Sequence, residues 1–265
     1  MAGRIRTGIG GWTFPPWRGV FYPEGLRQAD ELAYASSKLG AIEINGTYYS
    51  LQKPASFAAW AAATPDDFAF AIKASRFCTN RRVLGETGEA IERFMGQGLT
   101  ELGPKLGPIL WQFMATKKFD AEDFSAFLAL LPTSLAGQPL RHCVEVRHAS
   151  FAVPDFVELA RKNNVAICAS ENPDYPLIAD VTADFVYARL MKGRDEIETG
   201  YEAADLDTWA RRFSAYSKGE TPPDLPGLTP PAPVAERDVF AFFISAGKVR
   251  APAAAVALAE RLQRC

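Results

Sequence analysis

The sequence predicts a single (β/α)8 barrel of the TIM type. Short apolar or alternating segments recur along the 265 residues, and each has the length and composition of a β-strand. The segments between them space their apolar residues at three and four positions, as amphipathic helices do. Because strand-helix alternation builds a parallel sheet, and eight such units fill a chain of this length, one closed barrel is favoured over two domains.

The expected strands are eight in number and spread evenly over the chain. They are RIRTGIG (4–10), AIEIN (41–45), DFAFAIKA (67–74), PILWQF (108–113), HCVEVRH (142–148), VAICAS (165–170), DFVYARL (184–190) and DVFAFFIS (238–245). Clear helical stripes follow the fourth and seventh strands, at 124–131 and 206–216, and an alanine-rich helix ends the chain at 251–262. The unit after the sixth strand is the weakest, because its prolines leave room only for a short helix.

One proline-rich segment, residues 218–237, interrupts the pattern before the last strand. It has almost no helix or strand signal. Only one strand and one helix follow it, which is too little for a second domain. We therefore expect residues 1–265 to form one barrel domain, with this segment as a stiff surface excursion rather than an interdomain linker.

The composition narrows the class of protein. With 29 basic and 31 acidic residues the net charge is −2, which disfavours a surface that tracks nucleic-acid phosphates without excluding one. The four cysteines show no CxxC spacing, which argues against a structural zinc site. No apolar stretch reaches membrane-spanning length without charge. We expect a soluble, cytoplasmic protein that does not bind membranes; the sequence leaves its oligomeric state open.

Polar residues alternate with apolar ones near the carboxyl ends of several strands. In the second strand Ile42 and Ile44 would face the helices, which turns Glu43 and Asn45 to the barrel interior. The same alternation turns further polar side chains inward, namely Lys73, Gln112, Glu145, Arg147 and Arg189. Barrel enzymes carry their active sites at the carboxyl ends of the strands. Because five strands place polar side chains near that end, the sequence predicts a shared pocket there.

The expected roles divide by residue type. Two carboxylates in one pocket can act as general acid and general base, so Glu43 and Glu145 are the catalytic candidates, with His148 as a secondary proton carrier. The candidates for ligand binding are Asn45, Lys73, Gln112, Arg147, Arg189, Trp12 and Tyr201. Arginines clamp carboxylates or phosphates well, so the ligand is expected to be small and polar or anionic.

Each role has a structural alternative. Glu145 and Arg147 can equally form an ion pair without chemistry. The aromatic loop after the first strand can wall the pocket through Trp12, whereas Phe14 and Phe21 are better explained as a hydrophobic plug. We expect no cofactor; a divalent metal held by Glu43, Glu145 and His148 is the alternative, and the nearby cations disfavour it.

Five sequence blocks carry a family resemblance. GIGGWTFPPWRGVFYPEG, AIEINGTYYSLQKPASFAAWAAATPDDFAFAIKAS, LGPKLGPILWQF, VEVRHASF and VYARL resemble, in this order, the blocks of domain-of-unknown-function family 72, the YecE-like proteins. The blocks span nearly the whole chain. The resemblance implies a TIM-type barrel with a polar cluster at its carboxyl end, and it implies no reaction.

The chain departs from the family pattern at three places. Asn80 stands where the resemblance predicts a histidine, and Met191 stands where it predicts another. Ile244 and Ser245 replace asparagines after the last strand. If those positions bind metal or transfer protons in relatives, that role is altered in this chain.

We expect a hydrolase- or lyase-like enzyme that acts on a small polar or anionic metabolite. The alternative is a non-catalytic barrel that binds a ligand or a nucleic-acid end. The two differ in whether a ligand that stabilises the protein is also turned over.

Overall fold

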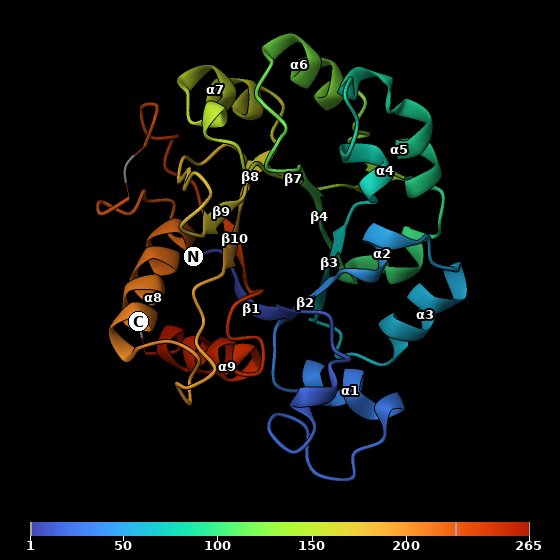
Figure 1. The fold of residues 1–265 in the computed structure, drawn as a ribbon, viewed down its shortest axis with the longest axis vertical. Coiled ribbons are helices and arrows are strands. Elements are labelled where there is room, and N and C mark those ends of the chain that lie inside the picture. The colour runs from blue at the N-terminus through green and yellow to red at the C-terminus, as the bar shows by residue number, and fades with distance from the viewer. Residues whose placement is uncertain (1, 226, 265) are drawn as a thin grey trace.

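The computed structural model describes residues 2–225 and 227–264 and confirms the predicted barrel. Figure 1 looks along the barrel, with a ring of strands inside a ring of helices. The sheet order is β8-β7-β4-β3-β2-β1-β11-β10-β9, and every pairing in it is parallel. Since β8 and β9 are two parts of one strand, interrupted at Cys168, the sheet closes almost completely.

The strands lie where the alternating segments place them. Their bounds are β1 Ile5–Gly10, β2 Ala41–Ile44, β3 Ala69–Lys73, β4 Leu106–Gln112, β7 His142–Glu145, β8 Ala166–Ile167, β9 Ala169–Glu171, β10 Phe185–Leu190 and β11 Asp238–Phe243. A small antiparallel hairpin of β5 Ser134–Leu135 and β6 Gln138–Pro139 lies outside the barrel sheet.

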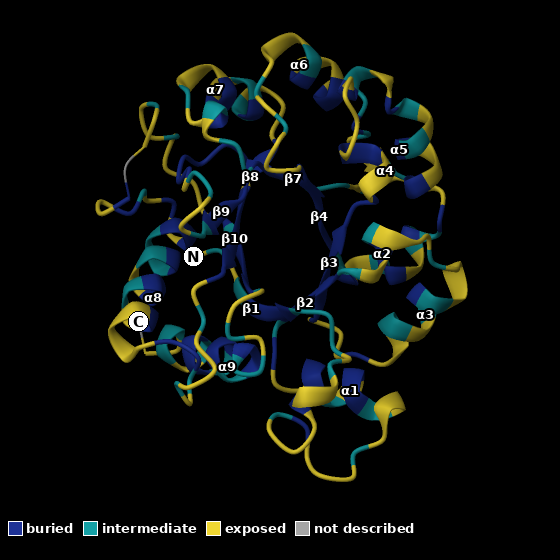
Figure 2. Ribbon diagram, in the orientation of Figure 1, coloured by how far each residue is buried: buried dark blue, intermediate teal, exposed yellow. Residues whose placement is uncertain are grey.

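Helices cover the outside of the barrel. They are α1 Glu31–Ser36, α2 Gly46–Tyr49, α3 Pro54–Ala62, α4 Arg76–Thr79, α5 Gly88–Met95, α6 Ala121–Ala129, α7 Pro154–Lys162, α8 Ala203–Ser217 and α9 Ala251–Leu262. Figure 2 shows their outer faces exposed and the strands buried. Residues 172–184, between β9 and β10, form no helix, because the prolines expected to shorten this unit leave no helical turn at all. No helix in the described part of the chain is long and apolar enough to cross a membrane.

The alternation of strand side chains is as predicted. Ile42, Ile44 and Val144 pack into the large core between strands and helices. A second, smaller core fills the barrel itself, and it includes Ala71, Cys143, Cys168, Phe240 and Phe242. The polar residues therefore lie above an apolar plug, at the carboxyl ends of the strands.

Gly8 shows how tightly the first two strands meet. A Cβ at this position would lie 2.1 Å from the carbonyl oxygen of Ala41 and 3.1 Å from the Phe242 ring. Real Cβ atoms do not approach a backbone oxygen so closely, so only glycine lets β1 and β2 pair here.

The proline-rich segment lies outside the barrel. Its described residues between 221 and 237 form neither helix nor strand. The backbone amides of Leu228 and Thr229 donate hydrogen bonds to the Asp180 carboxylate. The Leu228 amide lies 2.9 Å from Oδ2, and the Thr229 amide lies 2.9 Å from Oδ1. The Arg237 guanidinium donates to backbone carbonyls of the same segment, including that of Pro233 at 2.7 Å. The segment is therefore fixed by buried polar contacts in place of regular structure.

Candidate functional site

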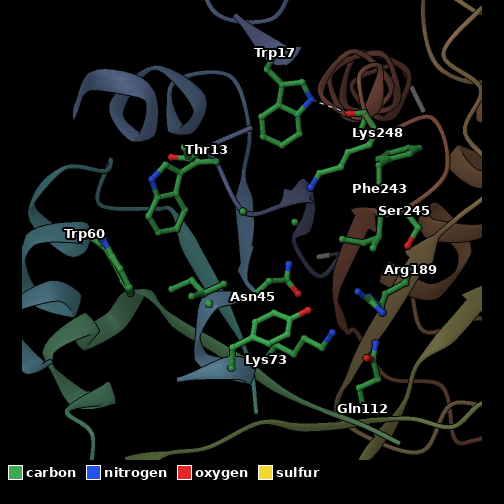
Figure 3. A pocket seen from close by; sticks show the side chains of 18 of the residues that line it. Thr13, Trp17, Asn45, Trp60, Lys73, Gln112, Arg189, Phe243, Ser245 and Lys248 are labelled. Carbon is green, nitrogen blue, oxygen red and sulfur yellow. Dashed lines mark hydrogen bonds between the residues drawn. The ribbon is translucent and has the colours of Figure 1, made fainter. Parts of the chain in front are cut away.

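A cavity of about 760 Å³ lies at the carboxyl ends of the strands. In Figure 3 the side chains of Asn45, Lys73, Gln112 and Arg189 converge on it from four strands or strand ends. The volume falls within the range of pockets that enclose small metabolites. Its lining also includes Trp12, Trp17, Trp60, Arg147, Ser245 and Lys248.

An arginine between two glutamates forms the floor. Arg189, on β10, is 2% exposed, and its Nη2 donates to Glu43 Oε1 at 3.1 Å. Its Nη1 donates to Glu145 Oε2. Both carboxylates are 0% exposed, and the guanidinium lies between them. The lining of the cavity therefore includes Arg189 but neither glutamate. Among the described atoms the Arg189 Nε finds no hydrogen-bond partner.

Two neutral side chains complete the hydrogen bonding of the carboxylates. The Tyr187 hydroxyl donates to Glu43 Oε2 at 2.7 Å, and Gln112 Nε2 donates to Glu145 Oε2 at 2.8 Å. A buried carboxylate with two or three such partners is held in one orientation. The arrangement thus fixes Arg189 at the bottom of the cavity.

Glu145 stays ionised despite its burial. Burial alone would raise the pKa of this carboxyl, but Arg189 and Arg147 outweigh it and lower the pKa from 4.5 to about 2. Burial would likewise lower the pKa of Arg189, and Glu145 and Glu43 raise it above its usual value instead. Both groups are therefore charged at neutral pH, and Glu145 cannot carry a proton there.

Arg147 bridges the floor and the cavity opening. Its Nε and Nη2 donate to Glu145 Oε1 at 2.9 and 2.8 Å. The guanidinium lies over the Tyr175 ring, 4.7 Å from the centroid. Its side chain is 22% exposed and lines the cavity, so this charge faces both the carboxylate and a bound ligand.

Lys73, the last residue of β3, reaches the same cavity. It is 9% exposed, and its amine lies 4.3 Å from the centre of the Tyr48 ring. Burial and the nearby Arg189 lower the pKa of Lys73 to about 8, although Glu43 and Glu145 act in the opposite direction. A lysine in this range exchanges its proton near neutral pH.

Aromatic side chains wall the opposite side. Trp12 meets Trp60 of α3 edge to face, with ring centroids 5.2 Å apart. The Trp17 indole donates to the Lys248 carbonyl at 2.7 Å (Figure 3). The Lys248 amine lies 4.3 Å from the Phe14 ring centre. Trp12 lines the cavity as expected, while Phe14 packs against the core. The wall is suited to the apolar part of a ligand.

Two predicted site residues lie elsewhere. The His148 ring accepts from the Ser150 amide at 3.1 Å and contacts the Ser150 hydroxyl at 2.9 Å, which places it at the start of a short 3-10 helix outside the cavity lining. Tyr201 is 4% exposed and donates to Glu171 at 2.9 Å, and its hydroxyl also accepts from the Lys192 amide. Both side chains have structural hydrogen bonds that account for them.

The carboxylates hold a different position from the one expected of a general acid and base. Glu43 and Glu145 were predicted to reach a ligand, but Arg189 covers both. Within the described ranges, no group of three or more His, Cys, Asp or Glu side chains is placed to hold a metal ion.

Sequence reasoning did not select Trp60, Lys248 or Tyr48. Lys248 lies beyond the end of β11, in the loop before α9, so the strand alternation that selected Lys73 does not reach it. Trp60 and Tyr48 lie on helices, and no strand pattern points to them. Their relation to the cavity depends on how helices pack, which the chain order does not reveal.

Of the positions that depart from the family pattern, Ile244 and Ser245 line the cavity, whereas Asn80 and Met191 lie outside its lining. Asn80 Nδ2 donates to the Tyr48 hydroxyl at 3.3 Å, and the same Tyr48 ring contacts the Lys73 amine. Ser245 lines the cavity with φ of +72°, a left-handed conformation that asparagine, expected there from the resemblance, adopts more readily.

Solved structures with the same fold exist. A DUF72 family protein of Thermotoga maritima MSB8 matches with a TM-score of 0.75 and 23% identity, over 98% of this chain and 99% of that chain. A DUF72 family protein of Enterococcus faecalis V583 matches with a TM-score of 0.69 and 16% identity, over 98% of each chain. At these identities the likeness supports the fold alone.

Sequence comparison gives the family. The UPF0759 protein YecE of Escherichia coli K12 is 29% identical over 243 residues, which cover 82% of this chain and 84% of YecE. The model of a family described as protein of unknown function DUF72 matches residues 6–265. Because that match spans almost the entire sequence, the chain belongs to the DUF72 family.

Proposed function

We propose that this protein is a hydrolase- or lyase-like enzyme that binds a small anionic metabolite in the cavity at the carboxyl ends of its strands. The supporting observation is the sign of the charges that face the cavity. Lys73, Arg147, Arg189 and Lys248 line it, and no aspartate or glutamate belongs to its described lining. An anion entering this space meets these cations, and the carboxylates that pair with the two arginines lie beneath them.

The charges of the floor favour an anionic ligand. Glu43 and Glu145 balance two of the three cations around them, Lys73, Arg147 and Arg189, so one positive charge remains uncompensated. A buried charge without a partner is costly, and an anionic ligand removes that cost. Arg147 and Arg189 would hold the anionic group, and the tryptophan wall would contact the remainder.

Proton transfer in this proposal is assigned to Lys73. Glu145 is held as an anion by two arginines, whereas Lys73 has a pKa of about 8 and faces the cavity. The carboxylates then act as positioning residues, which orient Arg189 and supply its counter-charge. A hydrolytic or lyase-like step needs such a group that gives and takes a proton near neutral pH.

A ligand screen with a turnover measurement tests the proposal. Thermal unfolding is followed with carboxylates, phosphate esters and their neutral analogues at constant ionic strength, and each stabilising compound is then incubated with the protein and analysed by mass spectrometry. We expect anions to stabilise, and at least one to be converted. Equal stabilisation by the neutral analogues would contradict the proposal.

Matched variants localise the effect. Lys73→Met removes a cavity charge, and Lys162→Met removes an exposed charge from α7, away from the cavity. Stabilisation by the anion should fall in the first variant and persist in the second, because both lose the same net charge. An equal fall in both would show that only the overall charge matters.

A non-catalytic ligand-binding barrel is the second candidate. The observation that favours it is the complete burial of Glu43 and Glu145, which removes the usual acid and base from the cavity. This candidate predicts stabilisation by the same anions without conversion of any of them. Turnover that Lys73→Met abolishes would rule it out.

A further inference from the structure

We infer that Lys73 forms an imine with the carbonyl carbon of a small anionic aldehyde or ketone. The inference rests on the proposed anion-binding cavity, because it names the substrate class for that cavity, and it gives Lys73 a covalent role in place of proton transfer. Three observations carry it: the placement of the amine, the absence of a competing partner and the charges around it.

The placement is that of a nucleophile at the bottom of a cavity. Lys73 ends β3 and extends among Asn45, Gln112 and Arg189 (Figure 3). The side chain is 9% exposed and lines the cavity, so a ligand reaches it while bulk solvent largely does not. Water exclusion favours an imine, because water hydrolyses it.

The amine is not occupied by an acceptor. Throughout residues 2–225 and 227–264 no carboxylate or carbonyl lies in hydrogen-bond or ion-pair contact with Lys73 Nζ; its described neighbour is the face of Tyr48. Glu43 and Glu145 are the acids that would pair with it, and both are engaged by Arg189. The floor thus withholds a counter-ion from the lysine at the bottom of the cavity.

Lys105 shows the contrasting case within the same chain. It is buried to a similar degree, at 8% exposed, and its amine donates to the carbonyls of Ala61 and Thr64 at 2.6 Å each. A lysine bound in this way is structural, since attack would break both hydrogen bonds. Because Lys105 is as buried as Lys73 but has hydrogen-bond acceptors, it is an internal control for the reactivity of Lys73.

Burial, together with the two neighbouring arginines, lowers the pKa of Lys73 and so maintains a reactive fraction of neutral amine. The groups that face Lys73 are Arg189 on β10, Glu43 on β2, Glu145 on β7, Arg147 just after it, and Tyr48 on α2. With a pKa of about 8, roughly a tenth of the amine is neutral near pH 7. An unperturbed lysine would have less than a hundredth of that fraction, so Lys73 is the preferred nucleophile.

The step balances without any further reactant. The neutral amine adds to the carbonyl carbon, a C–N bond forms, and one amine proton passes to the oxygen. The C–O bond of this carbinolamine then breaks, and water leaves with both former amine hydrogens. Protonation of the imine nitrogen from solvent restores the positive charge, which draws electrons from a neighbouring bond as a lyase-like reaction requires.

The anionic group is expected on Arg147 or Arg189. Both guanidiniums line the cavity with Lys73, so an anion bound there brings its own carbonyl group to the amine. A 2-oxo acid and a ketone phosphate share this chemistry. Trapping with one compound of each class shows which of the two the cavity takes.

Reductive trapping tests the inference on the wild-type protein. The protein is incubated near neutral pH with pyruvate in one arm and dihydroxyacetone phosphate in the other, with cyanoborohydride, which adds hydride to an imine carbon. Peptide mapping by mass spectrometry then locates the secondary amine. We expect an adduct on Lys73 in at least one arm, formed at least tenfold faster than on Lys105 or on exposed lysines, and its loss in Lys73→Arg.

The outcomes separate this inference from the proposed function. Adducts confined to exposed lysines in both arms would overturn the imine. If the same probes, or anions without a carbonyl group, nevertheless raise the unfolding temperature, the anion-binding proposal stands alone. If no anion raises the unfolding temperature and no adduct forms on Lys73, the imine and the anion-binding proposal are both overturned. The mapping needs no variant, so a Lys73→Arg protein that fails to fold leaves the test intact.

Discussion

Glu145→Gln should destabilise the protein strongly, although the two side chains have nearly the same shape. Glu145 is 0% exposed and accepts hydrogen bonds from Arg189, Arg147 and Gln112. The variant removes the negative charge and places an amide NH₂ among three donors. Arg189 would then be buried with Glu43 as its remaining counter-charge.

The lowered pKa of Glu145 gives the magnitude. A fall from 4.5 to about 2 corresponds to about 3 kcal/mol of stability at neutral pH. Removing one partner of a buried ion pair costs about 3–5 kcal/mol in other proteins, which agrees with this value. At about 2–4 °C per kcal/mol for a chain of this size, a loss of about 3 kcal/mol would lower the unfolding temperature by roughly 6–12 °C.

Urea unfolding of the wild type and the variant measures the loss directly. The sign of its pH dependence follows from the depressed pKa: the contribution of Glu145 is complete above its unfolded value of 4.5 and disappears as the pH falls through about 2. The difference between the two proteins should therefore be largest near about pH 7 and smaller near about pH 3.

Two results would refute this reasoning. A variant within about 1 kcal/mol of the wild type near neutral pH would show that the ion pairs offset no burial cost. A loss that stays constant down to about pH 3 would show that packing, and not charge, is responsible.

Three further variants test the framework around the site. Tyr187→Phe removes the hydrogen bond to Glu43, and urea unfolding should show a loss of about 1.5–3 kcal/mol because the acceptor is charged and buried. Gly8→Ala forces a methyl group against a carbonyl oxygen of β2, so we expect a loss of more than about 3 kcal/mol by the same measurement; wild-type stability would contradict the close approach. Asp180→Ala releases the 221–237 segment, so limited proteolysis there should accelerate roughly tenfold or more; an unchanged rate would count against that anchor.

The barrel follows from local pattern because each strand carries its own alternation. Ile42 and Ile44 against Glu43, or Val144 and Val146 against Glu145, each fix which side faces the helices. No long-range information is needed for that step, since burial of the apolar face decides it. The same alternation placed Lys73 and Arg189 at one end of the barrel.

The depth of each polar residue could not be predicted in the same way. Glu43 and Asn45 alternate identically, yet the first is completely buried and the second lines the cavity. The difference arises because Arg189, 146 residues away along the chain, closes over the glutamate. Whether a carboxylate meets a ligand or an arginine depends on that distant partner, and strand periodicity carries no information about it.

The most direct test of the central claim is a crystal structure of the protein with the anion that most raises its unfolding temperature. We expect the anionic group within hydrogen-bond distance of Arg147, Arg189 or Lys73, and the rest of the ligand against the Trp12–Trp60 wall. An anion bound on the helices or at the amino-terminal end of the barrel, with the cavity containing only water, would contradict it.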